Sequence, residues 1–317
     1  MTFLISLLNS MPGAAAQGLA WGIMAIGVYI TYKILDIADL TVDGSIGTGA
    51  AVCVLLTING VPVWIAMLCA VLAGLLAGLV TGLLHTACGI PAILSGILTQ
   101  LALYSVNLRI MGWGTDTGKS NLPVSVDKYH LLVSARYVRS AALNNPLIPL
   151  AIFVALVIAL LYWFFGTELG CSLRATGANG NMARAQGINT NRCKVLGLMV
   201  SNGLVALSGA LLAQYQGFSD VNMGRGAIVI GLAAVIIGEV LFSKVFRNFA
   251  LKLLACAIGA VIYYVVIQVV LRLGLSTDDL KLLTALVVAV FLAVPYWKGR
   301  YFAKKVMPAQ KGGQANA

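Results

Sequence analysis

The composition of this chain excludes a soluble globular protein. Its 317 residues are 60% hydrophobic and only 10% charged, whereas about a quarter of the residues in soluble domains carry a charge. The formal net charge of +11 could suggest a nucleic-acid partner, but the basic residues lie in short segments between apolar runs, where membrane orientation and anionic lipid account for them. The sequence therefore predicts a membrane protein that binds no nucleic acid.

Long apolar runs predict an all-α polytopic membrane protein with about nine transmembrane helices, within a range of eight to ten. Most runs have about twenty residues, enough for a helix to cross about 30 Å of hydrocarbon, and they lack the period-two alternation of a transmembrane β-barrel. A short interfacial helix over residues 1–12, ending at Pro12, is predicted before the first span. The predicted spans are about 14–34, 44–58, 62–84, 91–110, 146–165, 195–217, 226–242, 253–271 and 282–297.

Two segments that begin with aspartate predict an inverted repeat of spans one to four and six to nine. Asp39-Leu40-Thr41-Val42 and Asp220-Val221-Asn222-Met223 each follow a glycine-rich span and precede a short helix that contains glycines. Because five spans separate them, the halves, about 14–111 and 195–297, would have opposite orientations across the membrane. Such paired short helices point to the translocation path of a transporter. The candidate path residues are Asp39, Thr41, Asp43, Ser45, Asp220, Asn222 and Met223.

The polar segment 167–194, between the fifth and sixth predicted spans, is the strongest functional candidate. Asn179 can cap a helix of about two turns, and Gly187 can end that helix in the left-handed conformation. The segment carries four basic residues against the single Glu168, so the positive-inside rule places it in the cytoplasm, together with the C-terminal tail, 298–317. A basic loop that only anchors at lipid headgroups is the alternative interpretation.

The same segment resembles the cytoplasmic coupling loop of bacterial ABC-importer permeases related to the branched-chain amino acid and ribose permeases. The resemblance rests on Arg174-Ala175, Met182-Ala183 and Gly187-Ile188-Asn189-Thr190 followed by Arg192, and the wider pattern runs from about Gln17 to Pro295. In that family the loop docks on the ATPase subunit. The resemblance implies this coupling role for Arg174, Asn179, Asn181, Met182, Ala183, Arg184, Ala185, Gln186 and Gly187.

The resemblance further implies one permease domain over 1–317, in a bacterial inner membrane, that forms the path of an importer. Its implied partners are an ABC ATPase that binds the ATP, an extracytoplasmic solute-binding protein, lipid and a second copy of the chain in a homodimer. An amino acid is the implied cargo, with an aromatic one favoured, while a sugar or nucleoside stays open. A self-sufficient secondary transporter, with Asp39, Asp43 and Asp220 as proton or sodium coupling sites, is the alternative function.

No enzyme or cofactor site emerges from the sequence. The chain has no P-loop, HExxH or GxSxG motif, so ATP hydrolysis is expected on another chain. Its six cysteines form no CxxC pair, and its two histidines, His85 and His130, add no metal-ligand pattern. Glu239 is interpreted as an interfacial acid near Lys244 and Arg247, and a proton site in a carrier is the alternative. The series Gly74, Gly78 and Gly82 is interpreted as a packing surface for a neighbouring helix.

Three arginines are predicted to contact the solute-binding protein. Arg136 and Arg139 lie in a stretch predicted to be partly helical, 129–139, and Arg225 lies at the outer mouth of the seventh span. The planar guanidinium group pairs bidentately with carboxylates on a partner surface. Anchoring of the same arginines at lipid headgroups is the alternative.

Overall fold

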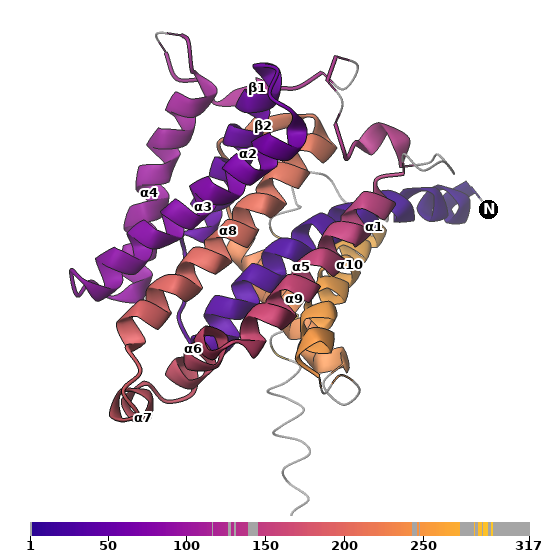
Figure 1. Cartoon of the computed structure of the whole chain (residues 1–317). Helices are drawn as coiled ribbons and strands as arrows, with labels where there is room; N and C mark the ends of the chain where they lie inside the picture. Colours follow the sequence, from indigo (N-terminus) through magenta and orange to yellow (C-terminus); the bar gives the residue numbers. More distant parts are fainter. Residues whose placement is uncertain are drawn as a thin grey trace, which may run out of the picture.

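A computed structural model describes residues 2–115, 117–125, 128–129, 131–138, 145–242, 246 and 248–272, together with 282, 285–286, 288–290 and 293. The described chain is a bundle of helices with one pair of short strands, β1 (Asn121–Pro123) and β2 (Phe218–Asp220). The strands pair antiparallel, with Leu122 opposite Ser219. Figure 1 shows helices α6 and α7 at one end of the bundle and the strands at the other.

The helices divide into long ones, two of intermediate length and a short pair. In chain order they are α1 (Thr2–Tyr29), the π-helical turn η1 (Ile30–Ile34), α2 (Val42–Ile58), α3 (Val63–Thr86), α4 (Ala92–Met111), the 3-10 turn η2 (Ala135–Tyr137), α5 (Leu147–Gly166), α6 (Glu168–Ala178), α7 (Gly180–Ala185), α8 (Thr190–Gln216), α9 (Ala227–Phe242) and α10 (Phe249–Arg272).

Six of these helical segments are long and apolar enough to span a membrane, namely Ser10–Ile34, Val63–Thr86, Ala92–Met111, Leu147–Gly166, Thr190–Gln216 and Phe249–Leu271. Helices α2 and α9 are shorter and also apolar. These helices lie where the first eight spans are predicted, and the ninth, 282–297, falls mostly outside the described residues. The all-α membrane architecture is therefore confirmed, while the number of nine spans stays a prediction.

Helix α8 lies at the centre of the bundle, packed against α1, α2 and α3. Two buried serines fasten it to α1, since Ser201 Oγ donates to the Gly27 carbonyl and Ser208 Oγ to the Ala20 carbonyl, both at 2.8 Å. On its other side, the series Gly74, Gly78 and Gly82 lies directly against α8, where a Cβ at Gly78 would overlap the backbone of Leu198. The predicted packing role of this glycine series is confirmed.

One local prediction is wrong, and a second holds only in part. Helix α1 continues through Pro12 instead of stopping there, because a proline in a helix removes one hydrogen bond while the other backbone groups of the helix remain paired. The helical stretch predicted over 129–139 is reduced to η2. The reason is tertiary, since the Leu132 N–H donates to Gln214 Oε1 of α8 at 3.3 Å and Ser134 has extended backbone angles.

Candidate functional site

The segment between α5 and α8 folds into two short helices at one end of the bundle (Figure 1). Thr167 Oγ1 accepts from the Gly170 N–H where α6 begins, and Asn179 Oδ1 accepts from the Met182 N–H at 3.1 Å where α7 begins. Gly187 follows α7 with a φ of +82°, a left-handed conformation that suits the end of a helix. The short helix predicted after Asn179 is confirmed with both of its ends.

Helix α6 is packed against the bundle and was not predicted. Gly177 lies against the carbonyl of Ile34 at the end of η1, and Leu173 is fully buried. Arg174 donates from Nη2 to the Phe165 carbonyl at 2.6 Å and lies over the ring of Phe249, 5.9 Å from its centroid. Arg174, predicted to couple to an ATPase, thus also joins α6 to α5 and α10.

Helix α7 has one exposed face and one packed face. Ala183 is buried, and its carbonyl accepts from the Ile188 N–H at 3.0 Å. Arg184 Nε donates to Thr190 Oγ1 at 2.8 Å, which fixes α7 to the first turn of α8. The exposed members of the predicted coupling set are Arg174, Asn179, Asn181, Met182, Arg184, Ala185, Gln186 and Gly187.

Three of the predicted path residues form a buried polar cluster, the Asp39 cluster, with two side chains from other helices. Asp39 accepts from the Thr41 N–H at 2.9 Å and from Asn202 Nδ2 of α8 at 2.7 Å. Ser45 Oγ donates to Asn202 Oδ1 at 2.6 Å, and the hydroxyls of Thr41 and Thr81 lie 2.8 Å apart. All five side chains are buried. A role for this cluster in the path stays a prediction.

The other path candidates meet where α2 and α9 begin. Asp43, in the first turn of α2, accepts from the N–H groups of Gly226 and Ile228, each at 3.0 Å. A carboxylate at the start of a helix satisfies amides that have no partner within the helix and complements the helix dipole. Asp220 Oδ1 accepts from the Asn222 N–H at 2.7 Å, the same turn that Asp39 makes with Thr41. Met223, by contrast, is half-buried against the hydrophobic core.

A cavity of about 330 Å³, the α2–α4 cavity, opens beside this junction. Within the membrane-spanning part of the chain it gathers an acid, an arginine, two amides and a phenol, a set that can bind a small polar ligand. Neither Gln100 nor Asn107 is among the site residues predicted from the sequence. The lining residues are Asp43, Gly44, Gln100, Leu101, Tyr104, Asn107, Val221 and Arg225.

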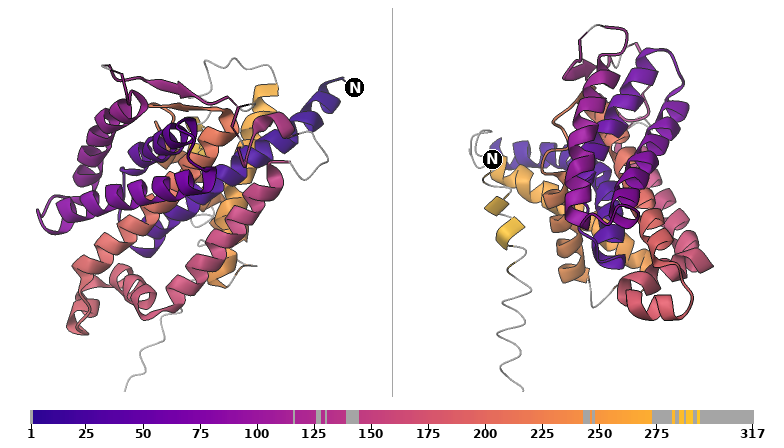
Figure 2. Two further views of the ribbon diagram at one scale, coloured as in Figure 1. Left: turned by 45° about the horizontal axis from the view of Figure 1, so that its top comes forward. Right: turned by 90° about the vertical axis from the view of Figure 1, so that its left-hand side faces the viewer.

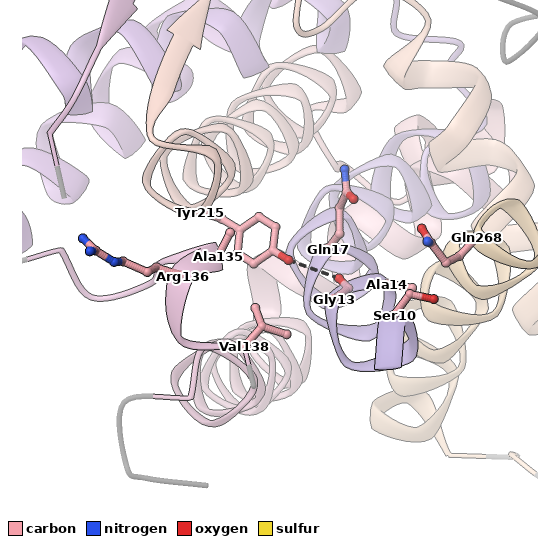
Figure 3. Close-up of a pocket in the computed structure, with 9 residues that line it drawn as sticks. All are labelled: Ser10, Gly13, Ala14, Gln17, Ala135, Arg136, Val138, Tyr215 and Gln268. Carbon is pink, nitrogen blue, oxygen red and sulfur yellow. Dashed lines mark hydrogen bonds between the residues drawn. The ribbon is translucent and has the colours of Figure 1, made fainter. Parts of the chain in front are cut away.

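The predicted docking arginines border neighbouring cavities. Arg136 lines a cavity of about 510 Å³ with Gln17, Tyr215 and Gln268, and Figure 3 shows its side chain extending away from these three. Arg225 borders a cavity of about 650 Å³ that Gln17 and Gln268 also line. The structure therefore brings Arg136 and Arg225 to the same region, while Arg139 lies outside the described residues.

The remaining titratable candidates have local partners. Glu239 pairs with Lys33, with 3.2 Å between Lys33 Nζ and Glu239 Oε1, and its predicted neighbours Lys244 and Arg247 lie outside the described residues. His85 Nδ1 lies 2.9 Å from the Ile90 carbonyl, and its Nε2 lies 3.3 Å from Lys194 Nζ. Among the described residues, no group of three or more His, Cys, Asp or Glu side chains could hold a metal ion.

Comparison with known proteins decides the family. The model of a family described as the permease component of the branched-chain amino acid transport system matches residues 10–295. The chain belongs to this family. It is the membrane-spanning permease subunit of an ATP-binding-cassette importer, a multi-pass transport subunit. The family assignment thus favours the predicted ABC importer over the self-sufficient secondary transporter.

Individual relatives of this permease agree with the family. The tyrosine transport system permease protein of Clostridioides difficile (strain R20291) is 45% identical over 286 residues, which cover 90% of this chain and 91% of that protein. A nucleoside ABC transporter permease protein of Lactococcus lactis is 37% identical over 90 residues, 27% of this chain and 28% of that protein. The solved structure of PsaBC from Streptococcus pneumoniae in complex with Fab covers 95% of this chain and 99% of that chain, with a TM-score of 0.54 and 19% identity, and this likeness concerns the fold alone.

Proposed function

We propose that this permease imports an aromatic amino acid, with tyrosine as the first candidate. The observation that carries the proposal is the 45% identity, over 90% of the chain, to a protein named as a tyrosine transport permease. A nucleoside is the second candidate, because a named nucleoside permease is 37% identical over 27% of the chain. The much larger extent of the first match favours the amino acid.

The proposed assembly has two copies of this chain, two ABC ATPase subunits on the α6–α7 side and a solute-binding protein on the opposite side of a bacterial inner membrane. The ATP is bound and hydrolysed by the ATPase. The exposed face of α7 supports the first contact, since it offers Asn181, Met182 and Ala185 to a partner at one end of the bundle. For the second contact, Arg136 supplies a cation on the segment that precedes α5.

We also propose that the two halves of the permease chain are inverted repeats, in which α1, α2 and α3 correspond to α8, α9 and α10. Helix packing supports the correspondence, because α3 lies along α8 as α10 lies along α1, and α2 packs on α3 and α8 as α9 packs on α10 and α1. The matching turns at Asp39 and Asp220 support it as well. The path would then pass the junction at which α2 and α9 begin.

Uptake into proteoliposomes tests the proposed substrate. The permease is reconstituted with its ATPase and its solute-binding protein, and ATP-dependent accumulation of radiolabelled L-tyrosine, L-leucine and uridine is compared. We expect accumulation of tyrosine that unlabelled phenylalanine or tryptophan reduces. Accumulation of uridine or leucine without tyrosine would overturn the aromatic substrate. An ATPase-inactive variant of the partner subunit serves as the control for passive leakage.

A further inference from the structure

The α2–α4 cavity carries an arginine and an aspartate on its walls. Arg225 lines it, and the Arg225 guanidinium makes no hydrogen bond or ion pair with any residue that the structure describes. Asp43 lines it too, and its carboxyl oxygens accept from the N–H groups of Gly226 and Ile228. A ligand with charges of both signs complements these walls.

An unpaired buried amide oxygen makes the second, independent observation. Asn107 lines the same cavity and is 1% exposed. Its Nδ2 faces the Gly44 carbonyl at 3.4 Å, which orients the amide, and its Oδ1 has no hydrogen-bond partner among the described residues. A buried acceptor without a donor is costly, so a ligand that brings an N–H group to Asn107 Oδ1 is stabilised there.

We propose that the α2–α4 cavity binds the zwitterionic head of the transported amino acid, with the carboxylate at Arg225 and the ammonium at Asn107 Oδ1. This inference rests on the proposed transport of an amino acid. The bidentate guanidinium suits the carboxylate. The ammonium lies in the field of Asp43, because Asn107 touches the first turn of α2 at Gly44, next to Asp43. Tyr104 and Leu101 offer apolar surface to the rest of the solute.

The size and place of the cavity fit this role. Its volume of about 330 Å³ lies at the lower end of the range of about 300–1,000 Å³ for small-molecule sites. Figures 1 and 2 show the end of α4 that carries Asn107 on the side of β1 and β2, away from α6 and α7. A solute released by a binding protein on that side reaches this cavity before it reaches the α6–α7 end.

Ligands that lack one of the two charges test this proposal. The solute-binding protein is left out, so that its own selectivity does not contribute to the result. Full-length permease in lipid nanodiscs is incubated with tritiated L-tyrosine, and tyramine, which lacks the carboxylate, and 3-(4-hydroxyphenyl)propionate, which lacks the ammonium, serve as competitors. We expect both to compete at least tenfold more weakly than L-tyrosine. Against Arg225→Gln, tyramine and tyrosine should compete equally, and against Asn107→Leu, the propionate and tyrosine should compete equally.

Matched variants separate recognition from misfolding. Arg225→Lys should restore much of the preference for the carboxylate. Arg109→Gln, which removes an exposed arginine of α4 outside the cavity, should leave tyrosine binding unchanged. In the reconstituted importer, Arg225→Gln and Asn107→Leu should lower tyrosine uptake at least tenfold.

The outcomes distinguish the two proposals. In one outcome the wild-type importer accumulates tyrosine, and Arg225→Gln and Asn107→Leu match it in uptake and in competitor preference. This outcome overturns the assignment of the α2–α4 cavity as the amino-acid site and leaves the proposed function intact. A wild-type importer that accumulates no amino acid overturns the proposed function, and the cavity assignment with it.

Discussion

Asp39 is a buried acidic residue, and its carboxyl group therefore needs hydrogen-bond donors from within the bundle. It lies inside the bundle, and its carboxyl oxygens accept from the Asn202 amide and the Thr41 N–H. The same Asn202 side chain accepts from Ser45, so one amide satisfies two buried groups. Polar contacts of this kind resist any displacement of α8 against the turn before α2.

The first prediction is that Asn202→Leu destabilises the permease by about 1–3 kcal/mol, because it removes the donor to one of the two oxygens of the buried Asp39 carboxyl group. Ser208→Ala, which removes one neutral hydrogen bond between α8 and α1, should cost about 0.5–1.5 kcal/mol. Unfolding in mixed micelles at increasing denaturing detergent measures both. The Asp39→Leu, Asn202→Leu double variant should lose less than the sum of its single variants, and strict additivity would contradict the assigned pairing.

At the residue scale, sequence reasoning identified the acids but not their partners. Asp39, Asp43 and Asp220 could be selected because carboxylates beside apolar spans are costly unless they are used or paired. Their partners Asn202 and Gly226 lie more than 160 residues further along the chain than Asp39 and Asp43 respectively. Only packing brings these groups together, and one sequence contains no signal for that packing.

At the scale of elements, the close approach of α6 to the end of η1 depends on a glycine. A Cβ at Gly177 would overlap the carbonyl of Ile34, whereas a Cβ at Gly180 would meet nothing within 4 Å. Both glycines belong to short helices of the same segment, so they form a matched pair for substitution.

The second prediction is that Gly177→Ala destabilises the α6 contact by about 1–3 kcal/mol, since overpacking against backbone outweighs the gain in helix propensity. Gly180→Ala should be neutral or stabilise the protein by up to about 1 kcal/mol. Thermal unfolding in detergent, with limited proteolysis of 166–194 as a local measure, compares them. Equal effects of the two substitutions would contradict the packing of α6.

The third prediction concerns the exposed face of α7. Ala185→Glu should reduce copurification of the ATPase and uptake at least tenfold while membrane insertion persists, because a bulky charge would stand on the proposed contact face. Ala185→Ser is the conservative control. Ala183→Glu should instead impair folding, since Ala183 is buried. Normal uptake by the Ala185→Glu importer would place the ATPase contact elsewhere.

Local signals explain which elements could be predicted. Asn179 and Gly187 mark the two ends of α7 in the sequence, because caps act within one turn. Helix α6 has a weaker sequence signal, an N-cap at Thr167 followed by Glu168. Its glycines at 170 and 177 lower its helix propensity, so its helical state depends on packing against the bundle. In the stretch 129–139 the described residues form only the turn η2, because the Gln214 side chain of α8 accepts from the Leu132 N–H, which a longer helix would use.

At the scale of the whole molecule, the orientation in the membrane can be measured directly. The fourth prediction is that Lys119→Cys reacts with an impermeant thiol reagent from outside the cell, while Asn181→Cys reacts only after permeabilisation, because positive-inside reasoning places 167–194 in the cytoplasm. The native exposed thiols, Cys88 and Cys171, must first be replaced by alanine. Labelling of Asn181→Cys in intact cells would reverse the orientation.

Hydropathy was sufficient to place the first eight predicted spans near the helices observed, because apolar length is a local property. It could not predict that α8 is central and that α4 touches chiefly α2 and α3, because lipid and a neighbouring helix are equally apolar surroundings for a side chain. The series Gly74, Gly78 and Gly82 did indicate from the sequence that another helix packs closely on α3.

The contact of Asp43 with the start of α9 has a mechanical consequence. The Asp43 side chain accepts two hydrogen bonds that hold the first turns of α2 and α9 together, and Gly224 lies directly against the Asp43 carbonyl. A motion that separated the two halves of one chain would remove the hydrogen-bond partners of a carboxyl group and of two backbone N–H groups. Each permease chain is therefore expected to move as one rigid body during transport, so that the force of ATP hydrolysis opens and closes the boundary between chains.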